Sequence, residues 1–112
     1  MKQSYVPEAG DIVWMQFNPQ AGREQAGHRA AVVLSPASYN VRAGLMLCCP
    51  MTTQIKGYPF EVLIGGKEPS VVLADQVKSL DWRVREAIYK GSVALDELAE
   101  IRAKALALIG RA

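Results

Sequence analysis

Residues 29–36 read RAAVVLSP, an apolar run that opens on an arginine and is closed by a proline. A short, continuous apolar run that ends at a turn signal is typical of a buried β-strand. The residues before it differ in kind: EQAGHRA at 24–30 holds a carboxylate, an amide, the only histidine of the chain and the arginine itself. The sequence therefore predicts a chemically dense loop that leads directly into a buried strand.

Similar short runs lie on both sides of this strand. Because they are separated by Gly, Pro and Asn at near-constant spacing, they favour an all-β sheet or a small barrel. Proline cannot donate to a strand ladder, so Pro50 predicts an edge strand or a bulge in its run. The runs are GDIVWMQF (10–17), LMLCCPMTT (45–53), YPFEVLI (58–64) and VVLADQVKSL (71–80), the last read as one long strand.

Two segments have helical character. SPASYNVRAG at 35–44 predicts a turn or a single helical turn that ends at Gly44. ALDELAEIRAKALALIG at 94–110 predicts a C-terminal helix, with acidic residues in its first turn and a glycine at its end. A shorter helical turn is expected at Trp82, before a last strand near residues 90–93. The apolar face expected for the C-terminal helix consists of Leu95, Leu98, Ile101, Ala105, Leu108 and Ile109.

The predicted fold class is mainly β, a small β-barrel with a C-terminal helix packed on one side. The 112 residues fit one domain, residues 1–112, and 50% of them are hydrophobic, which is enough for a core. A net charge of +2 is too mild for a general nucleic-acid binder, so any basic patch must be local. The chain has no spanning apolar run and no apolar leader, so we expect a cytoplasmic protein that does not contact a membrane.

The two cysteines, Cys48 and Cys49, are neighbours in one predicted strand. Neighbouring side chains of a strand point to opposite faces, so the two thiols are expected to be buried and not to pair with each other. The chain has no C-x-x-C motif and no histidine cluster. We therefore expect no metal site and no cofactor.

Three polar stretches are candidates for chemistry. In the first, Glu24 can accept a proton, His28 titrates near neutrality and Arg29 carries a donor fork suited to phosphate. The spacing alone also fits a solvated loop with an exposed Glu–Arg pair. The second stretch, MTTQIKG at 51–57, offers Thr52, Thr53, Gln54 and Lys56, and it also fits a β-branched strand end before a turn.

The third stretch is ADQVKS at 74–79, inside the last predicted strand. Alternation along a strand would place Gln76 and Lys78 on one face, with Asp75 and Val77 on the other. The polar face of an edge strand is the alternative. The tryptophans, Trp14 and Trp82, are expected to be core or interface anchors and not platforms for base stacking.

Taken together, these stretches resemble the MazF branch of the MazF/PemK/Kid toxins. The resemblance covers residues 5–110, and it rests on the order and spacing of YVPEAGDIVW, EQAGHR, VVLSP followed by Y-N, TTQ-x-KGYPFEV and LADQVKS. It implies an SH3-like β-barrel with short helices, and the toxin of a bacterial type II toxin–antitoxin pair. It also implies a homodimer with RNA grooves along its interface, and an acidic, MazE-like antitoxin whose disordered tail covers the groove.

The activity implied by the resemblance is metal-independent cleavage of single-stranded RNA within a short, ACA-like sequence. The 2′-hydroxyl attacks the neighbouring phosphate, leaving a 2′,3′-cyclic phosphate and a 5′-hydroxyl. The family motif puts the catalytic arginine at Arg29 and the catalytic threonine at Thr52, with Glu24 as base or positioning group. RNA contacts are expected from His28, Thr53, Gln54, Lys56, Gln76 and Lys78.

Arginine holds its proton above about pH 12, so Arg29 is expected chiefly to stabilise the phosphorane. Two residues depart from the family pattern: Ala30 stands where proline is usual, and Asn18 where aspartate is common. Because proline restricts the residue before it to extended conformations, Ala30 predicts a less pre-organised Arg29, and hence a slower reaction or a less stable fold.

Two other functions fit the same predicted barrel. A non-enzymatic, CcdB-like toxin that binds gyrase would rely on a C-terminal Trp-Gly-Ile, whereas this chain ends ALIGRA. A plain SH3-like interaction module would need an aromatic peptide groove, and the aromatic residues do not cluster in the sequence.

Overall fold

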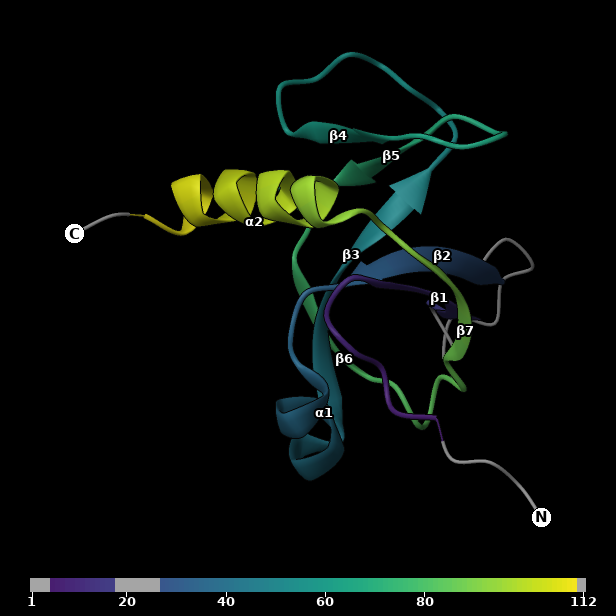
Figure 1. Cartoon of the computed structure of the whole chain (residues 1–112). Coiled ribbons are helices and arrows are strands. Elements are labelled where there is room, and N and C mark those ends of the chain that lie inside the picture. The colour runs from purple at the N-terminus through teal and green to yellow at the C-terminus, as the bar shows by residue number, and fades with distance from the viewer. Residues whose placement is uncertain (1–4, 18–26, 111–112) are drawn as a thin grey trace.

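The computed structural model describes residues 5–17 and 27–110. Within these ranges the strands form one antiparallel sheet in the order β4-β5-β3-β2-β1-β7, and β6 pairs with β3. Figure 1 shows the sheet curled around its interior, with α2 across one side, as the mainly β, barrel-like prediction required. The elements are β1 (Asp11–Gln16), β2 (His28–Val33), α1 (Ala37–Ala43), β3 (Leu45–Thr52), β4 (Glu61–Ile64), β5 (Ser70–Leu73), β6 (Lys78–Asp81), β7 (Ile88–Ser92) and α2 (Leu95–Ile109).

Two hydrophobic clusters fill the two sides of the curled sheet. Successive side chains of a strand point to opposite faces, so neighbours such as Val32 and Val33 enter different clusters. Cys48 and Cys49 divide in the same way, and both are free and fully buried, as predicted. Removal from water, the largest cause in each case, raises the pKa of both thiols to about 12.

Pro50 lies in the central strand β3, so the expectation of an edge strand or bulge is wrong. On one side β3 pairs with β2 through Pro50 itself, opposite Ala31. On the other side it pairs with β6 up to Cys48 and with β5 from Met51 onwards. The carbonyl of Leu47 accepts the N–H of Leu34, the residue that follows β2, so the backbone groups of Leu47 point towards β2. Because this direction alternates along a strand, the nitrogen of Pro50 points the other way, towards the gap between β6 and β5. The missing N–H therefore leaves no ladder bond unmade.

The expectation of one long strand over residues 71–80 is also wrong. A continuous strand in the register of β5, where Val72 pairs with Met51, would put Asp75 opposite Cys48. Lys78 takes that place instead, so residues 75–77 are looped out of the ladder. The loop begins with a turn in which Gln76 donates its N–H to the carbonyl of Leu73 at 3.0 Å. Alternation therefore does not apply to Asp75 and Gln76.

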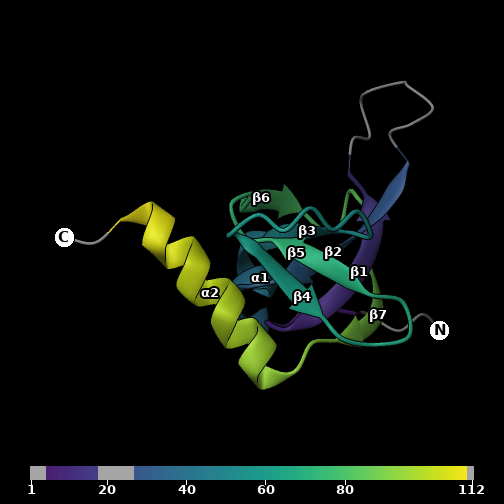
Figure 2. The same cartoon turned by 90° about the horizontal axis from the view of Figure 1, so that it is seen from above.

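The two helices match their predicted segments, and α1 ends at Gly44, whose φ of 72° suits glycine. The apolar face predicted for α2 is only partly buried: Leu98, Ile101 and Ala105 lie inside, whereas Leu95, Leu108 and Ile109 are 86%, 49% and 72% exposed. Figure 2 shows the C-terminal half of α2 extending past the body of the sheet, which explains the exposure of Leu108 and Ile109, whereas Leu95 is the first residue of the helix. No helix of the described residues is long and apolar enough to cross a membrane.

Candidate active site

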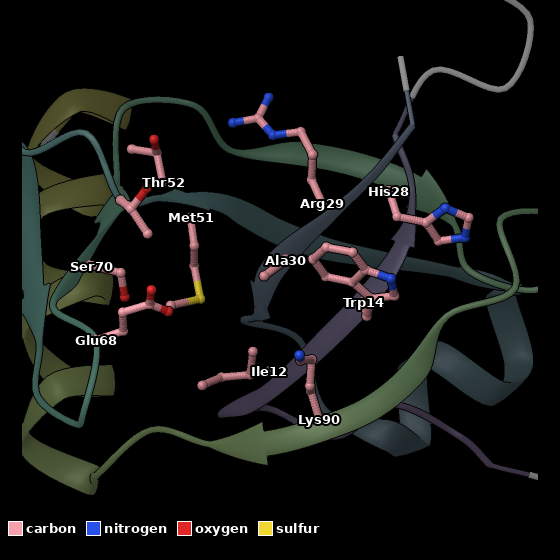
Figure 3. A pocket seen from close by; sticks show the side chains of 11 residues that line it. Ile12, Trp14, His28, Arg29, Ala30, Met51, Thr52, Glu68, Ser70 and Lys90 are labelled. Atoms are coloured by element: carbon pink, nitrogen blue, oxygen red, sulfur yellow. The ribbon is translucent and has the colours of Figure 1, made fainter. Parts of the chain in front are cut away.

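Arg29 and Thr52 lie on neighbouring strands at one end of the sheet. Arg29 pairs with Met15 across the β1–β2 ladder, and Ala31 pairs with Pro50 between β2 and β3. Extending the second register by two residues puts Thr52 opposite Arg29. In Figure 3 the guanidinium extends on the side of Thr52, and the His28 imidazole lies on the other side, beyond Trp14. The two residues assigned to catalysis by the resemblance are therefore brought together.

Two cavities meet at this pair, and Arg29 and Thr52 line both of them. The first, of about 480 Å³, is shown in Figure 3. The second is smaller, at about 210 Å³. The other residues of the first cavity are Ile12, Trp14, His28, Ala30, Met51, Thr53, Glu68, Ser70 and Lys90; those of the second are Gln54, Lys56, Tyr58, Glu61, Leu73, Asp75 and Gln76.

The guanidinium of Arg29 is held by an aromatic ring. Its central carbon lies 5.3 Å from the centroid of Phe17, which is itself only 7% exposed. A cation over an aromatic face is attracted by the ring quadrupole, so the contact orients the group without using its N–H donors. Among residues 5–17 and 27–110 no carboxylate forms an ion pair with Arg29. The N–H donors of the Arg29 guanidinium are therefore available to bind an anionic group.

Thr52 is arranged to donate a hydrogen bond. Its hydroxyl oxygen accepts the backbone N–H of Gln54 at 3.1 Å, at the point where β3 ends. A threonine hydroxyl has one proton to donate as well as two acceptor lone pairs. The bond from Gln54 therefore leaves the O–H free to point towards a group bound between the cavities.

The segment after Thr52 is fixed by Glu61, the first residue of β4. Its carboxylate accepts the backbone N–H of Lys56 at 3.2 Å and that of Gly57 at 2.9 Å. Gly57 has a φ of 83°, a left-handed conformation that favours glycine. The ammonium of Lys56 lies 5.9 Å from the ring centroid of Tyr58. Glu61 thereby shapes the loop that carries Gln54 and Lys56 to the second cavity.

The wall of the first cavity contains an aromatic stack. The rings of Trp14 and His28 lie 5.9 Å apart with an interplanar angle of 19°, and the ammonium of Lys90 is 5.1 Å from the Trp14 ring. Trp82 is a buried core residue as predicted, 6% exposed, and its indole N–H donates to the carbonyl of Asn40. Trp14 is no core residue, because it is 36% exposed and lines the cavity.

Two predicted placements are corrected near Arg29. His28 is not part of a loop: it is the first residue of β2 and pairs with Gln16, so it lies on the opposite face of the strand from Arg29. Asp75 and Gln76 were expected on opposite faces, but both line the second cavity, because the looped-out residues do not alternate. Lys78 lines neither cavity and pairs with Cys48 in β6.

Other residues of the site escaped the sequence analysis. Tyr58 and Glu61 belong to the motif KGYPFEV, which contributes to the family resemblance. The motif did not indicate that either residue lines the second cavity. Glu68 and Lys90 have no sequence signal, since only the folding of distant strands brings them to the first cavity. Glu24 and Asn18 lie outside the described residues. Within the described ranges no three His, Cys, Asp or Glu side chains gather as a metal site would require.

Known proteins resemble the chain along nearly its whole length. A model of the family described as PemK-like, MazF-like toxins of type II toxin–antitoxin systems matches residues 8–109. The endoribonuclease toxin MazF of Escherichia coli K12 is 58% identical over 111 residues, which are 98% of this chain and 100% of that protein. The endoribonuclease toxin ChpB of the same strain is 37% identical over 103 residues, 83% of this chain and 84% of that protein.

Solved structures agree with these relatives. The crystal structure of MazF from Deinococcus radiodurans has a TM-score of 0.87 and 52% identity, covering 96% of this chain and 100% of that one. A crystal structure of MazE–MazF from the same organism matches with a TM-score of 0.87 and 50% identity, again covering 96% of this chain and 100% of that one.

Proposed function

Because the chain belongs to the family of PemK-like, MazF-like toxins of type II toxin–antitoxin systems, we propose that this endoribonuclease toxin cleaves single-stranded RNA by its Arg29–Thr52 pair. The cleavage falls within a short, ACA-like sequence and needs no metal ion. The observation that carries the proposal is the position of this pair, on facing strands between two cavities.

In the proposed reaction a ribose 2′-hydroxyl attacks the adjacent phosphate. The resulting phosphorane carries two negative charges, and preorganised donors stabilise such charge best. Arg29 supplies a permanently protonated fork, and Thr52 donates its free O–H to a non-bridging oxygen. Glu24 acts as the base or positions it. The 2′-hydroxyl proton passes to that base, the 5′-oxygen takes up a proton from water and leaves as a hydroxyl, and the other product ends in a 2′,3′-cyclic phosphate.

The two cavities suit nucleotides on either side of the scissile phosphate, because Arg29 and Thr52 line both. Gln54, Lys56 and Gln76 offer amide and ammonium donors in the second cavity, and His28 and Thr53 lie at the first. Lys78, which is exposed on β6 and lines neither cavity, would add positive charge to the surface that binds RNA. Amide groups can read the edges of splayed bases, so these residues determine the recognised sequence.

We further propose that the toxin is a cytoplasmic homodimer and that a MazE-like acidic antitoxin covers its groove. The MazE–MazF structures of the Deinococcus radiodurans relative support an antitoxin of this kind. Exposed apolar residues on the protruding half of α2, Leu106 and Ile109, are 61% and 72% exposed and offer surface for a second copy.

The proposed function is tested with a long single-stranded RNA and its DNA copy in EDTA. We expect the RNA to be cut at short, repeated sequences with cyclic phosphate ends, and the DNA to stay intact because it lacks the 2′-hydroxyl. Arg29→Ala should abolish cleavage and leave the circular dichroism spectrum unchanged. Arg42→Ala, on the exposed surface of α1, is the matched control and should keep wild-type activity. Cleavage that requires a divalent metal would contradict the mechanism.

A further inference from the structure

Phe17, the residue beneath the guanidinium of Arg29, stands just beyond the end of two ladders. The β1–β2 ladder ends with Gln16 opposite His28. On the other side of β1, the ladder with β7 ends with Trp14 opposite Ile88. Among the residues that the structure describes, no strand pairing holds the backbone of Phe17, although its buried ring orients Arg29 from 5.3 Å away.

Arg85, in the turn between β6 and β7, forms hydrogen bonds with the end of β1 and with Phe17. One terminal nitrogen of its guanidinium donates to the carbonyl of Gln16 at 3.1 Å and also to the carbonyl of Phe17. Its own backbone carbonyl accepts the N–H of Gln16 at 3.2 Å. Backbone and side chain of Arg85 together extend the pairing of β1 through Phe17.

The turn that carries Arg85 is itself closely fixed. The carboxylate of Asp81 accepts the backbone N–H groups of Arg83 and Val84 at 3.0 and 2.9 Å. Ala87 donates its N–H to the carbonyl of Trp82, a core residue, at 3.0 Å. Glu86 has a φ of 55°, a left-handed conformation that is unfavourable for a residue other than glycine. The turn therefore aims the half-buried Arg85 inward, towards β1.

We propose that Arg85 is a positioning residue for RNA cleavage: it fixes Phe17, and Phe17 fixes where the guanidinium of Arg29 stands. This inference rests on the proposed function of Arg29. Stabilisation of a phosphorane depends on donors placed to within a fraction of an ångström, whereas binding of the whole RNA is spread over many contacts. Loss of Arg85 therefore lowers kcat and leaves KM nearly unchanged.

The variants are Arg85→Met, which keeps the length of the side chain without its donors, and Arg85→Lys, which keeps a charged donor. We expect Arg85→Met to lower kcat by about 10- to 100-fold, with KM within about twofold of wild type. Arg85→Lys should restore part of the lost kcat. Arg83→Met is the matched control in the same turn: Arg83 stacks on Trp82 and donates to the carbonyl of Val41, so its loss should spare kcat.

Phe17→Leu tests whether Arg85 acts through Phe17. If it does, Arg85→Met and Phe17→Leu together lower kcat by much less than the product of their separate effects. The proposal would be overturned if the loss of kcat in the double variant equalled the product of the two separate losses. It would also be overturned if Arg83→Met lowered kcat as much as Arg85→Met does, because either result would indicate general loosening of the fold. Unchanged kcat in Arg85→Met would overturn it as well.

A readout independent of activity separates this proposal from the proposed function. The guanidinium carbon of Arg29 lies 5.3 Å from the centroid of the Phe17 ring, so we expect the NMR shift of the Arg29 Nε–H to respond to the distance between the two groups. In Arg85→Met we expect this shift to differ from that of the wild type and to approach the value measured in Phe17→Leu. In Arg83→Met we expect it to equal that of the wild type. Should Arg85→Met not fold, Arg85→Gln carries the same comparison. A shift that Arg85 variants leave unchanged contradicts the positioning role, even if the wild type proves to cut no RNA.

Discussion

At the residue scale, Ala30 follows Arg29 at the position where the family usually has proline. The usual proline would restrict Arg29 to extended conformations. Here Arg29 is already extended within β2, paired with Met15, and Ala30 pairs with Trp14. The β2–β3 ladder ends at Ala31 opposite Pro50, one residue short of Ala30. The N–H of Leu34 donates to Leu47 of β3, and because backbone direction alternates along a strand, the N–H of Ala30 also points towards β3. The β2–β3 ladder has already ended there, so the N–H of Ala30 makes no ladder bond.

We therefore predict that Ala30→Pro raises the free energy of unfolding by about 0.4–1 kcal/mol, because it restricts the unfolded chain without removing a ladder bond. The cleavage rate should be equal to that of the wild type or higher. Urea unfolding and single-turnover cleavage measure the two effects. Ala31→Pro is the control: its N–H points towards β1, where Ala31 pairs with Val13, so that variant should be strongly destabilised. Equal destabilisation by both prolines would contradict the argument.

At the element scale, the loop between β3 and β4 depends on one carboxylate. Glu61 accepts two backbone N–H groups of the loop, and its own carbonyl accepts the ammonium of Lys104 from α2 at 3.0 Å. The loop carries Gln54, Lys56 and Tyr58 to the second cavity. Strand β4 and helix α2 together thus hold a surface that is proposed to contact RNA away from the reacting phosphate.

We predict that Glu61→Ala raises the KM for RNA by about tenfold and changes kcat by less than about threefold, because an ordered loop costs less entropy on binding. Glu61→Gln, which keeps one acceptor oxygen, should give an intermediate KM. Steady-state cleavage of a short RNA measures both constants. Glu100→Ala on α2 is the control, since its partly exposed ion pair with Lys104 contributes little. A fall in kcat at constant KM would refute this role for Glu61.

At the scale of the whole molecule, the curled sheet encloses two cores, and each holds one thiol. Cys48 lies with Met15, Met46 and Trp82, and Cys49 lies in the other cluster with Ile101 of α2. Burial raises the pKa of each thiol from 9.0 to about 12. The unfolded chain therefore loses these protons at lower pH than the folded protein does.

We predict that the free energy of unfolding falls as the pH rises from 9 towards 12. The sign follows because the unfolded state binds fewer protons than the native state in this window, and each thiol contributes at most about 1.4 kcal/mol per pH unit. Urea unfolding at a series of pH values measures the slope. The double variant Cys48→Ala, Cys49→Ala should be less stable at every pH but have a shallower slope. An identical slope would show that the thiols do not titrate as proposed.

The sequence by itself determined the identity of most elements and pointed to the pair that is proposed to be catalytic. Strands, helix ends and buried thiols follow from local signals, since alternation, the helical period, glycine and proline act within a few residues. The mainly β class, the C-terminal helix and the free, buried cysteines were predicted in this way and are confirmed. Arg29 and Thr52 were identified from motifs of a known family, and the β2–β3 register places them opposite each other.

Only the tertiary structure decided how distant strands meet. The three residues looped out between β5 and β6, the gap beside Pro50 and the end of α2 beyond the sheet all depend on register, which no local period encodes. The same holds for Arg85, which lies 68 residues from Phe17 in the chain and donates to its carbonyl. A side chain that completes another strand is invisible in the sequence, because its partner is a backbone group that every residue possesses.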